Sequence, residues 1–542
     1  MTRTFIVGAA AALGVLLAPA VAVAQGATGS ALQLSLEDAV QRAIEHNPEL
    51  AIVRLDTDAG AARVAESRGA FVPVVSTTAG RSRNTTPPAN ALSGSAGLDV
   101  NDWFSSSGVR QRVPWGGGTW SVSWDAGRTT TNSPITSFNP YLQSGIAAAF
   151  SQPLLKDRRI DSSRRQYIVA KRDRDNSELR LREAVVQTVA SVKQAYWTFK
   201  AALANIGVQQ QSLDLAQELV RQNQIRVDAG QAPPLDLVQA QAEVAQRKES
   251  LIQARATADD AEDRLRRMIM DPGDASFWSV RLDPVDAPPV PDALPDADEA
   301  VARALDGRLD LERAANDLEN AKTDVAFFGN QRLPDVRLEA SYRGSGLGGR
   351  QLLRTGDFPG VVTGSRATSF ADALGQAFGA DYPTWSLGVT VSYPLGRSYE
   401  EASLAHAQIE RQQAAQRIAS LRLDTAETVR RAARQVRSTA ERVEAARASA
   451  TLAEQRYNDE QRRYEVGLST TFLVTQAQRD LLQARVNMLQ TTLDYESAAV
   501  NFEAVQQAPP GDKASTVTVS GASIVLQPTP TPRGIFPANG GQ

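Results

Sequence analysis

From Val185 to Val227 the chain reads VVQTVASVKQAYWTFKAALANIGVQQQSLDLAQELVRQNQIRV, and this stretch decides the fold. Apolar side chains recur in it at spacings of three and four, between Gln, Glu, Arg and Ala residues, and it contains no proline. The pattern extends from Arg164 to Gly230. It predicts one unbroken helix that is about 100 Å long, because a helix rises about 1.5 Å per residue.

A second stretch of the same character runs from Ser398 to Gly467. Ser398 and Glu401 match a helix-capping box, and no proline interrupts the residues that follow. Two long helices of matched length indicate that the architecture is duplicated.

Segments that flank the first long helix recur around the second in the same order. Leu50 matches Leu311 and Pro73 matches Pro334 at one constant spacing. Each copy contains a short helix, a group of strands, a long helix, a glycine turn and a shorter helix. This order, present twice, predicts an internal repeat.

These patterns predict the boundaries of the whole chain. They are a signal peptide (1–24), a first repeat (25–270) with strands in 72–152, a long helix at 162–230 and a helix at 235–270, a linker (271–296), a second repeat (297–506) with strands in 334–394, a long helix at 398–467 and a helix at 471–506, and a disordered tail (507–542).

The segments between the helices contain alternating strands. Trp120–Trp124 and Trp385–Tyr393 alternate apolar with small polar residues and have aromatic ends, which is typical of strands that cross a membrane; a soluble β-sandwich is the alternative. Each repeat offers two clearly predicted strands, which makes four strands per chain. Four strands cannot close a barrel, since about eight strands is the lower limit. If these strands cross a membrane, several chains must share one barrel. A hairpin within 103–131 either spans the membrane or projects from it. The Gly-rich segments 87–101 and 344–382 are expected as loops.

The composition of the chain limits where the protein can reside and which chemical functions it can have. A net charge of −3 offers no basic surface for nucleic acid. Residues 1–24 have one charge, an apolar core and a small-residue cleavage pattern, so we expect a signal peptide rather than a lone membrane anchor. The chain has no cysteine, which excludes disulfides, thiolate metal sites and attachment of a lipid to cysteine. His46 and His406 have no plausible partner nearby in sequence, so we expect neither metal, cofactor nor catalysis.

Taken together, the chain resembles the TolC-like outer-membrane efflux proteins of bacteria. The resemblance covers Leu34 to about Val505. It is carried by Leu36-Glu37-Asp38-Ala39-Val40 through Asn47-Pro48-Glu49-Leu50, by the junctions Gln152-Pro153-Leu154 and Tyr393-Pro394-Leu395, and by the glycine turns Ala229-Gly230 and Val466-Gly467-Leu468-Ser469.

The resemblance implies an α+β membrane protein of the bacterial outer membrane. Long antiparallel coiled-coil hairpins would form a periplasmic tunnel, and a β-barrel shared between the protomers of a homotrimer would cross the membrane. A periplasmic adaptor protein, tied to an inner-membrane pump, would meet the tip formed by Ala229, Gly230, Val466, Gly467, Leu468 and Ser469.

The resemblance also implies two gate candidates. Asp236 and Tyr464 match positions that form polar links between neighbouring helix pairs in the family. An acid in the first turn of a helix and a packing tyrosine are the structural alternatives. Leu473 and Gln476 stand where some relatives have acidic rings, so we expect no cation-binding ring here.

Two other functions fit part of the pattern. An exported coiled-coil protein would explain the long helices but not the matching strands in both repeats. The outer-membrane component of a type I protein-secretion system would have the same fold and another cargo, so the sequence leaves the cargo open.

Overall fold

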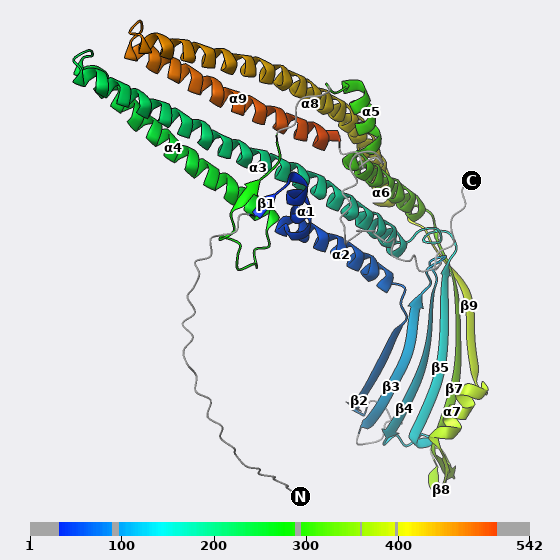
Figure 1. The fold of residues 1–542 in the computed structure, drawn as a ribbon. Coiled ribbons are helices and arrows are strands. Elements are labelled where there is room, and N and C mark those ends of the chain that lie inside the picture. Colours follow the sequence, from blue (N-terminus) through cyan, green and yellow to red (C-terminus); the bar gives the residue numbers. More distant parts are fainter. Residues whose placement is uncertain (1–31, 89–96, 288–293, 358–359, 396–398, 507–542) are drawn as a thin grey trace, which may run out of the picture.

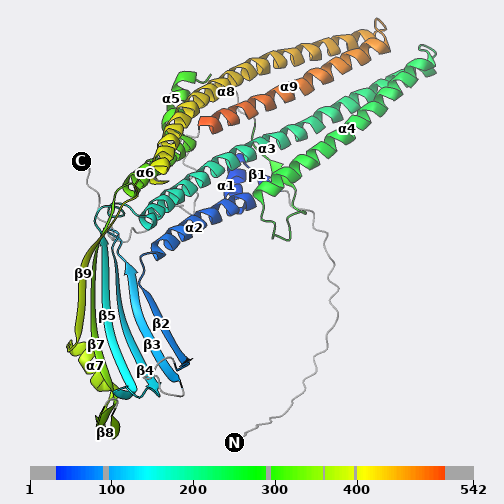
Figure 2. The ribbon, with the colours of Figure 1, turned by 180° about the vertical axis from the view of Figure 1, so that it is seen from behind.

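The computed structural model describes residues 32–88, 97–287, 294–357, 360–395 and 399–506 of the 542-residue chain. A long helical body carries a curled β-sheet at one end (Figure 1, Figure 2). Two helices of 67 residues each, α3 (Ser162–Asp228) and α8 (Tyr399–Glu465), run along the body. The expected cap at Ser398, the expected signal peptide and the expected tail lie outside the described residues.

Each long helix folds back on a helix of 36 residues at the end far from the sheet. α3 is followed by α4 (Pro234–Ile269), and α8 by α9 (Thr471–Gln506). Gly230 and Gly467 lie in the two turns with φ of 68° and 79°, where a Cβ would be strained. The glycines therefore allow each hairpin to reverse within a few residues.

Nearer the sheet, each long helix pairs with two shorter helices placed end to end. α1 (Leu36–His46) and α2 (Pro48–Gly69) lie along α3, and α5 (Ala297–Gly307) and α6 (Leu309–Gln331) lie along α8. Asn47 separates the first pair, since its side chain accepts hydrogen bonds from the first N–H groups of α2 and caps it. The second half of the chain repeats the first, so the predicted duplication is confirmed.

The largest apolar core lies at the middle of the helical body. Tyr196 and Phe199 of α3 are fully buried there against α1 and α4. Strands β1 (Leu32–Leu34) and β6 (Leu282–Pro284) pair in parallel beside this core. The Tyr196 hydroxyl bonds the Leu34 carbonyl and the Asp286 carboxylate, and this burial raises the pKa of Tyr196. The segment between the repeats is therefore fastened to the first repeat.

The sheet is antiparallel and has six long strands. In spatial order they are β2 (Val74–Thr86), β3 (Leu98–Arg112), β4 (Thr119–Thr131), β5 (Phe138–Pro153), β7 (Asp335–Thr355) and β9 (Pro383–Ser392). The short strand β8 (Val361–Thr368) pairs with the far end of β7. The first repeat therefore has four strands in the sheet, because the hairpin β3–β4, whose course the sequence left open, pairs with β2 and β5.

The described residues of the segment 344–382, which was expected as a loop, also form regular structure. β7 continues through Thr355, and helix α7 (Phe370–Gly379) follows β8. α7 packs on the face of the sheet that carries Trp124, whose ring lies 6.4 Å from that of Phe370. Glycines of β7 make room for it, because a Cβ at Gly346 would lie 1.7 Å from the Ala373 carbonyl oxygen.

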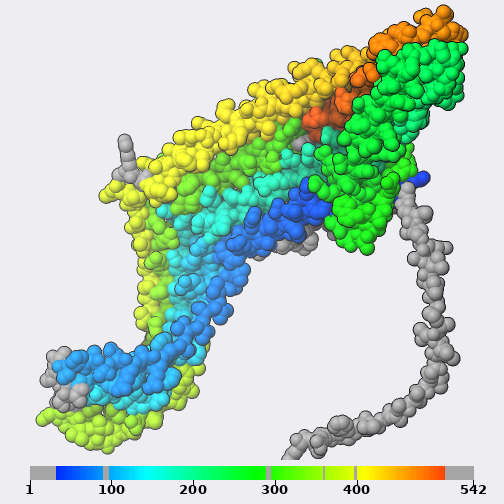
Figure 3. Space-filling model, turned by 90° about the vertical axis from the view of Figure 1, so that its left-hand side faces the viewer, coloured from blue at the N-terminus to red at the C-terminus, as the bar shows by residue number. Residues whose placement is uncertain are grey.

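Figure 3 shows the sheet bending away from the helical body at the end opposite the two turns. Among the described residues, no helix combines the length and the apolar character needed to cross a bilayer.

Candidate functional site

The two turns that carry the predicted site residues lie next to each other at one end of the molecule (Figure 1, Figure 2). Each turn closes one hairpin, so contacts here join the first repeat to the second. We call the five interacting polar residues of this end the tip cluster. They are Asn223, Arg226, Asp236, Tyr464 and Thr471.

Asn223 is the centre of the tip cluster. It is fully buried on α3, and its side-chain oxygen accepts hydrogen bonds from the hydroxyl groups of Tyr464 on α8 and Thr471 on α9. The Thr471 hydroxyl also lies 3.3 Å from Asp236 Oδ2 on α4. One amide thus connects both hairpins, and a buried polar group is costly to leave without its partners.

Arg226 adds a second contact between the hairpins. Its guanidinium lies 4.0 Å from the centre of the Tyr464 ring and donates to the Tyr464 backbone carbonyl. An arginine above an aromatic face is attracted by the ring quadrupole. Tyr464 is therefore held through its ring, its hydroxyl and its backbone.

A charged pair supports the tip cluster two turns farther along the hairpins. Arg479 of α9 lies 2.5 Å from a carboxylate oxygen of Glu243 on α4, and Arg247 pairs with the other oxygen. Burial opposes ionisation of Glu243, but the two arginines outweigh it and lower the pKa of that carboxyl. Glu243 thus stays charged and joins α4 to α9.

The structure shows where the gate candidates Asp236 and Tyr464 lie, and their role in a gate stays a prediction. The two residues belong to one cluster, yet each bonds Asn223 or Thr471 rather than the other. Asn223, Arg226 and Thr471 were missed. The sequence could have identified Asn223. It follows Leu219 by four residues on the buried stripe of α3, and a polar residue buried there needs a hydrogen-bond partner.

The predicted docking turns are exposed. Val466 and Leu468 expose 71% and 79% of their surface, and Ser469 donates a hydrogen bond to Glu460. Further exposed apolar residues lie in the helix ends that adjoin the two turns. These are Ile225, Leu235, Val238 and Phe472. An exposed apolar patch of this kind marks a contact surface.

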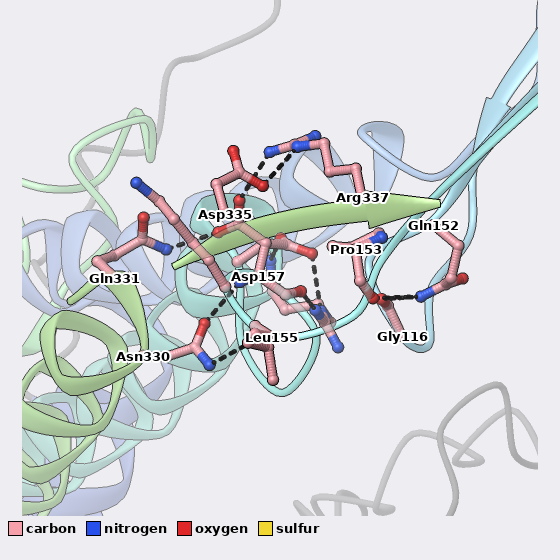
Figure 4. Close-up of polar contacts among 12 residues, drawn as sticks. Gly116, Gln152, Pro153, Leu155, Asp157, Asn330, Gln331, Asp335 and Arg337 are labelled. Carbon is pink, nitrogen blue, oxygen red and sulfur yellow. Dashed lines mark hydrogen bonds and ion pairs between the residues drawn. The ribbon is translucent and has the colours of Figure 1, made fainter. Parts of the chain in front are cut away.

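A second polar network fixes the sheet to the helices (Figure 4). Asp157 follows β5, and its backbone N–H donates to Asn330 Oδ1 of α6 at 2.7 Å. The Asp157 carboxylate accepts from Gln331 at 2.6 Å and from Arg337 of β7 at 3.3 Å. Asn330 also donates to the Leu155 carbonyl. The two repeats are therefore joined where strands become helices.

None of these groups is arranged for catalysis. His46 and His406 are exposed, and each lies near one glutamate. The described residues include no group of three or more His, Asp or Glu placed to hold a metal ion. The tip cluster joins helices of the two hairpins through polar contacts.

Comparisons with known proteins agree with this geometry. The family model "Outer membrane efflux protein" matches residues 39–269 and 300–505, one range in each repeat. No curated protein sequence is similar enough to count as a match.

Solved structures with the same fold are similar over most of their length. The Campylobacter jejuni CmeC outer membrane channel has a TM-score of 0.62 at 14% identity and covers 87% of this chain and 85% of its own. The outer-membrane channel OprN has a TM-score of 0.62 at 18% identity, and the match covers 88% of this chain and 90% of OprN. The open state of the Neisseria gonorrhoeae MtrE outer membrane channel has a TM-score of 0.60 at 16% identity, and the match covers 87% of this chain and 89% of MtrE. With its two repeats, long hairpins and curled sheet, the chain belongs to the outer membrane efflux protein family, whose members are transport channels and not enzymes.

Proposed function

We propose that three copies of this chain form the exit duct of a tripartite efflux system, which passes small toxic molecules across the periplasm and the outer membrane. The sheet would cross the membrane, and the hairpins would extend into the periplasm. The chain would be exported by its signal peptide and carry no lipid. Membership of the efflux family, together with hairpins that end in an exposed apolar tip, supports this proposal most directly.

The tip would meet a periplasmic adaptor protein tied to an inner-membrane pump. Val466 and Leu468 are among the most exposed apolar residues of the chain, and water-facing apolar groups at a hairpin end favour a protein partner. Transport within the duct would be passive, with the inner-membrane pump supplying the energy. The tip cluster would keep the duct closed until the partner engages.

The proposed docking is tested by adding a charge to the tip. Leu468→Arg should abolish drug resistance in a host whose own copy of the gene is removed, while the protein still reaches the outer membrane. Val361→Arg is the matched control, because Val361 is 73% exposed but lies on β8 at the opposite end. Full resistance with Leu468→Arg, at normal outer-membrane levels, would rule out docking through this turn.

A further inference from the structure

The two edges of the sheet have no partner within the described part of the chain. β2 pairs only with β3, and β9 pairs only with β7. β9 is exposed at all ten positions and carries no charged residue, and β2 is exposed at twelve of its thirteen. Proteins usually protect free sheet edges with charges, prolines or bulges. β2 has two arginines, Arg81 and Arg83, in its second half, and β9 has a proline only at its first position, Pro383. The first half of β2 and the rest of β9 have no such protection, which indicates that another strand covers them.

The direction of the strands identifies which edges fit together. Six long strands alternate in direction across the sheet, so β2 and β9 run in opposite directions. β9 of one copy can therefore meet β2 of a second copy as an antiparallel pair. An even number of strands is needed for this alternation to continue around a ring.

The hairpin β3–β4 has the same two faces as the strands around it. Residues directly opposite each other share a face of the sheet. One row across the six strands is apolar, and it consists of Val75, Val109, Val122, Ala148, Tyr342 and Trp385. The adjacent row is polar or small, and it consists of Ser76, Gly108, Ser123, Ala147, Arg343 and Thr384. A hairpin that projected into water would not need to continue both rows.

The length of the shared ladder fits a membrane. β9, the shortest of the six strands, has ten residues, or about 33 Å at about 3.3 Å per residue. Tilted by about 40°, it would span a height of about 25 Å, which matches the apolar band of outer-membrane barrels.

We propose that the channel closes as one barrel of eighteen strands, six from each of three copies, in which β9 of each copy pairs with β2 of the next. This inference rests on the trimer of the proposed function and specifies its wall. The two firm strands expected per repeat would give twelve strands and a barrel about 24 Å across, whereas eighteen give about 35 Å. The barrel is then as wide as a general porin, and the narrow part of the duct lies at the tip.

The first test asks whether β9 meets β2 of another copy. The chain has no cysteine, so introduced thiols react without background. Ser386→Cys on the polar face of β9 is combined in turn with a cysteine at each polar-face position of β2. These positions are Val74, Ser76, Thr78, Gly80 and Ser82. With a short bifunctional thiol reagent, at least one pair should convert most of the protein into a covalent trimer on a denaturing gel.

The control pair is Ser386→Cys with Ser123→Cys, because Ser123 lies on β4 inside the sheet. It should give no covalent trimer. Suppose the native mass is that of a trimer but none of the five edge pairs cross-links the copies. The proposed closure of the barrel is then wrong, while the proposed trimeric duct is unaffected. A native mass other than that of a trimer would instead contradict the proposed function.

The second test asks whether the hairpin β3–β4 stays in the wall of the assembled channel. Thr78→Cys with Ser106→Cys should cross-link within a chain, because these residues are paired on β2 and β3. Thr78→Cys with Ala147→Cys should not, because β3 and β4 separate β2 from β5. The reverse result would mean that the hairpin leaves the wall and that the barrel has twelve strands.

Discussion

At the scale of single residues, the members of the tip cluster differ in how many hydrogen bonds between helices a substitution would remove. Asn223 accepts from two hydroxyl groups, Tyr464 contributes one hydroxyl and one ring contact, and Asp236 accepts from one shared hydroxyl. Loss of a buried hydrogen-bond partner costs about 1–3 kcal/mol, and about 1.4 kcal/mol is tenfold in an equilibrium. Substitutions here should therefore open the channel to different extents.

We predict that closed-state conductance in planar bilayers rises most for Asn223→Ala, less for Tyr464→Phe and least for Asp236→Ala. Tyr457→Phe is the matched control, because Tyr457 lies on the same helix and its hydroxyl contacts Gln478 within one hairpin. Closed-state conductance equal to that of the unchanged protein in all three variants would remove the tip cluster from the gate.

A buried carboxyl gives the helical body a pH dependence. Glu496 on α9 is 4% exposed, between Leu493 and Val500 of the stripe that packs on the central core, and one of its oxygens has no hydrogen-bond partner. Burial raises the pKa of Glu496 to about 7. The folded state thus disfavours the charged form, so the contribution of this group is most favourable below about pH 4.3 and is lost as the pH rises to about 7.

We predict that Glu496→Gln raises the apparent melting temperature at pH 8 and changes it little at pH 5. The difference corresponds to at most about 3 kcal/mol per chain. Thermal unfolding of the detergent-solubilised protein at both pH values measures it, and Glu503→Gln, an exposed acid on the same helix, is the control. An equal effect of Glu496→Gln at the two pH values would contradict the prediction.

At the scale of elements, the long helices could be predicted and the full sheet could not. The spacing in 185–227 predicts a helix because periodicity is local, and the glycine turns mark where each helix ends. The alternation of Trp120–Trp124 predicts a strand but not its partners, since pairing depends on residues far along the chain. The same holds for the candidate site. Tyr464 could be predicted because it matches a position of the family that the chain resembles, whereas its bond to Asn223 could not, because that bond joins residues on separate helices.

Helix α7 provides a test of packing between a helix and a strand. It rests on Gly344, Gly346 and Gly348 of β7, and a Cβ at Gly346 would overlap the Ala373 carbonyl. We predict that Gly346→Ala displaces α7 and exposes it to protease in intact cells, while the trimer still forms. Gly388→Ala on β9 is the matched control, because nothing lies within 4 Å of a Cβ there. Unchanged protection of α7 in Gly346→Ala would show that the contact is dispensable.

At the scale of the whole molecule, the proposed duct would consist of two resistances in series, a wide barrel and a closed tip. Resistances in series add, so the larger one sets the conductance. The polar network of Asp157, Asn330 and Arg337 fixes the sheet to the helices, so opening at the tip need not change the width of the barrel. Barrel and tip can therefore be altered independently.

We predict that narrowing the barrel has no effect until the tip is open. Ser341 lies on the polar face of β7, so Ser341→Arg adds bulk to the lumen. Alone it should leave conductance in planar bilayers unchanged, because the tip dominates. In the Asn223→Ala background it should lower the conductance, because the barrel then carries a larger share of the total resistance. If Ser341→Arg alone reduced the conductance as strongly as it does in that background, the narrow part of the duct would have to lie in the barrel and not at the hairpin turns.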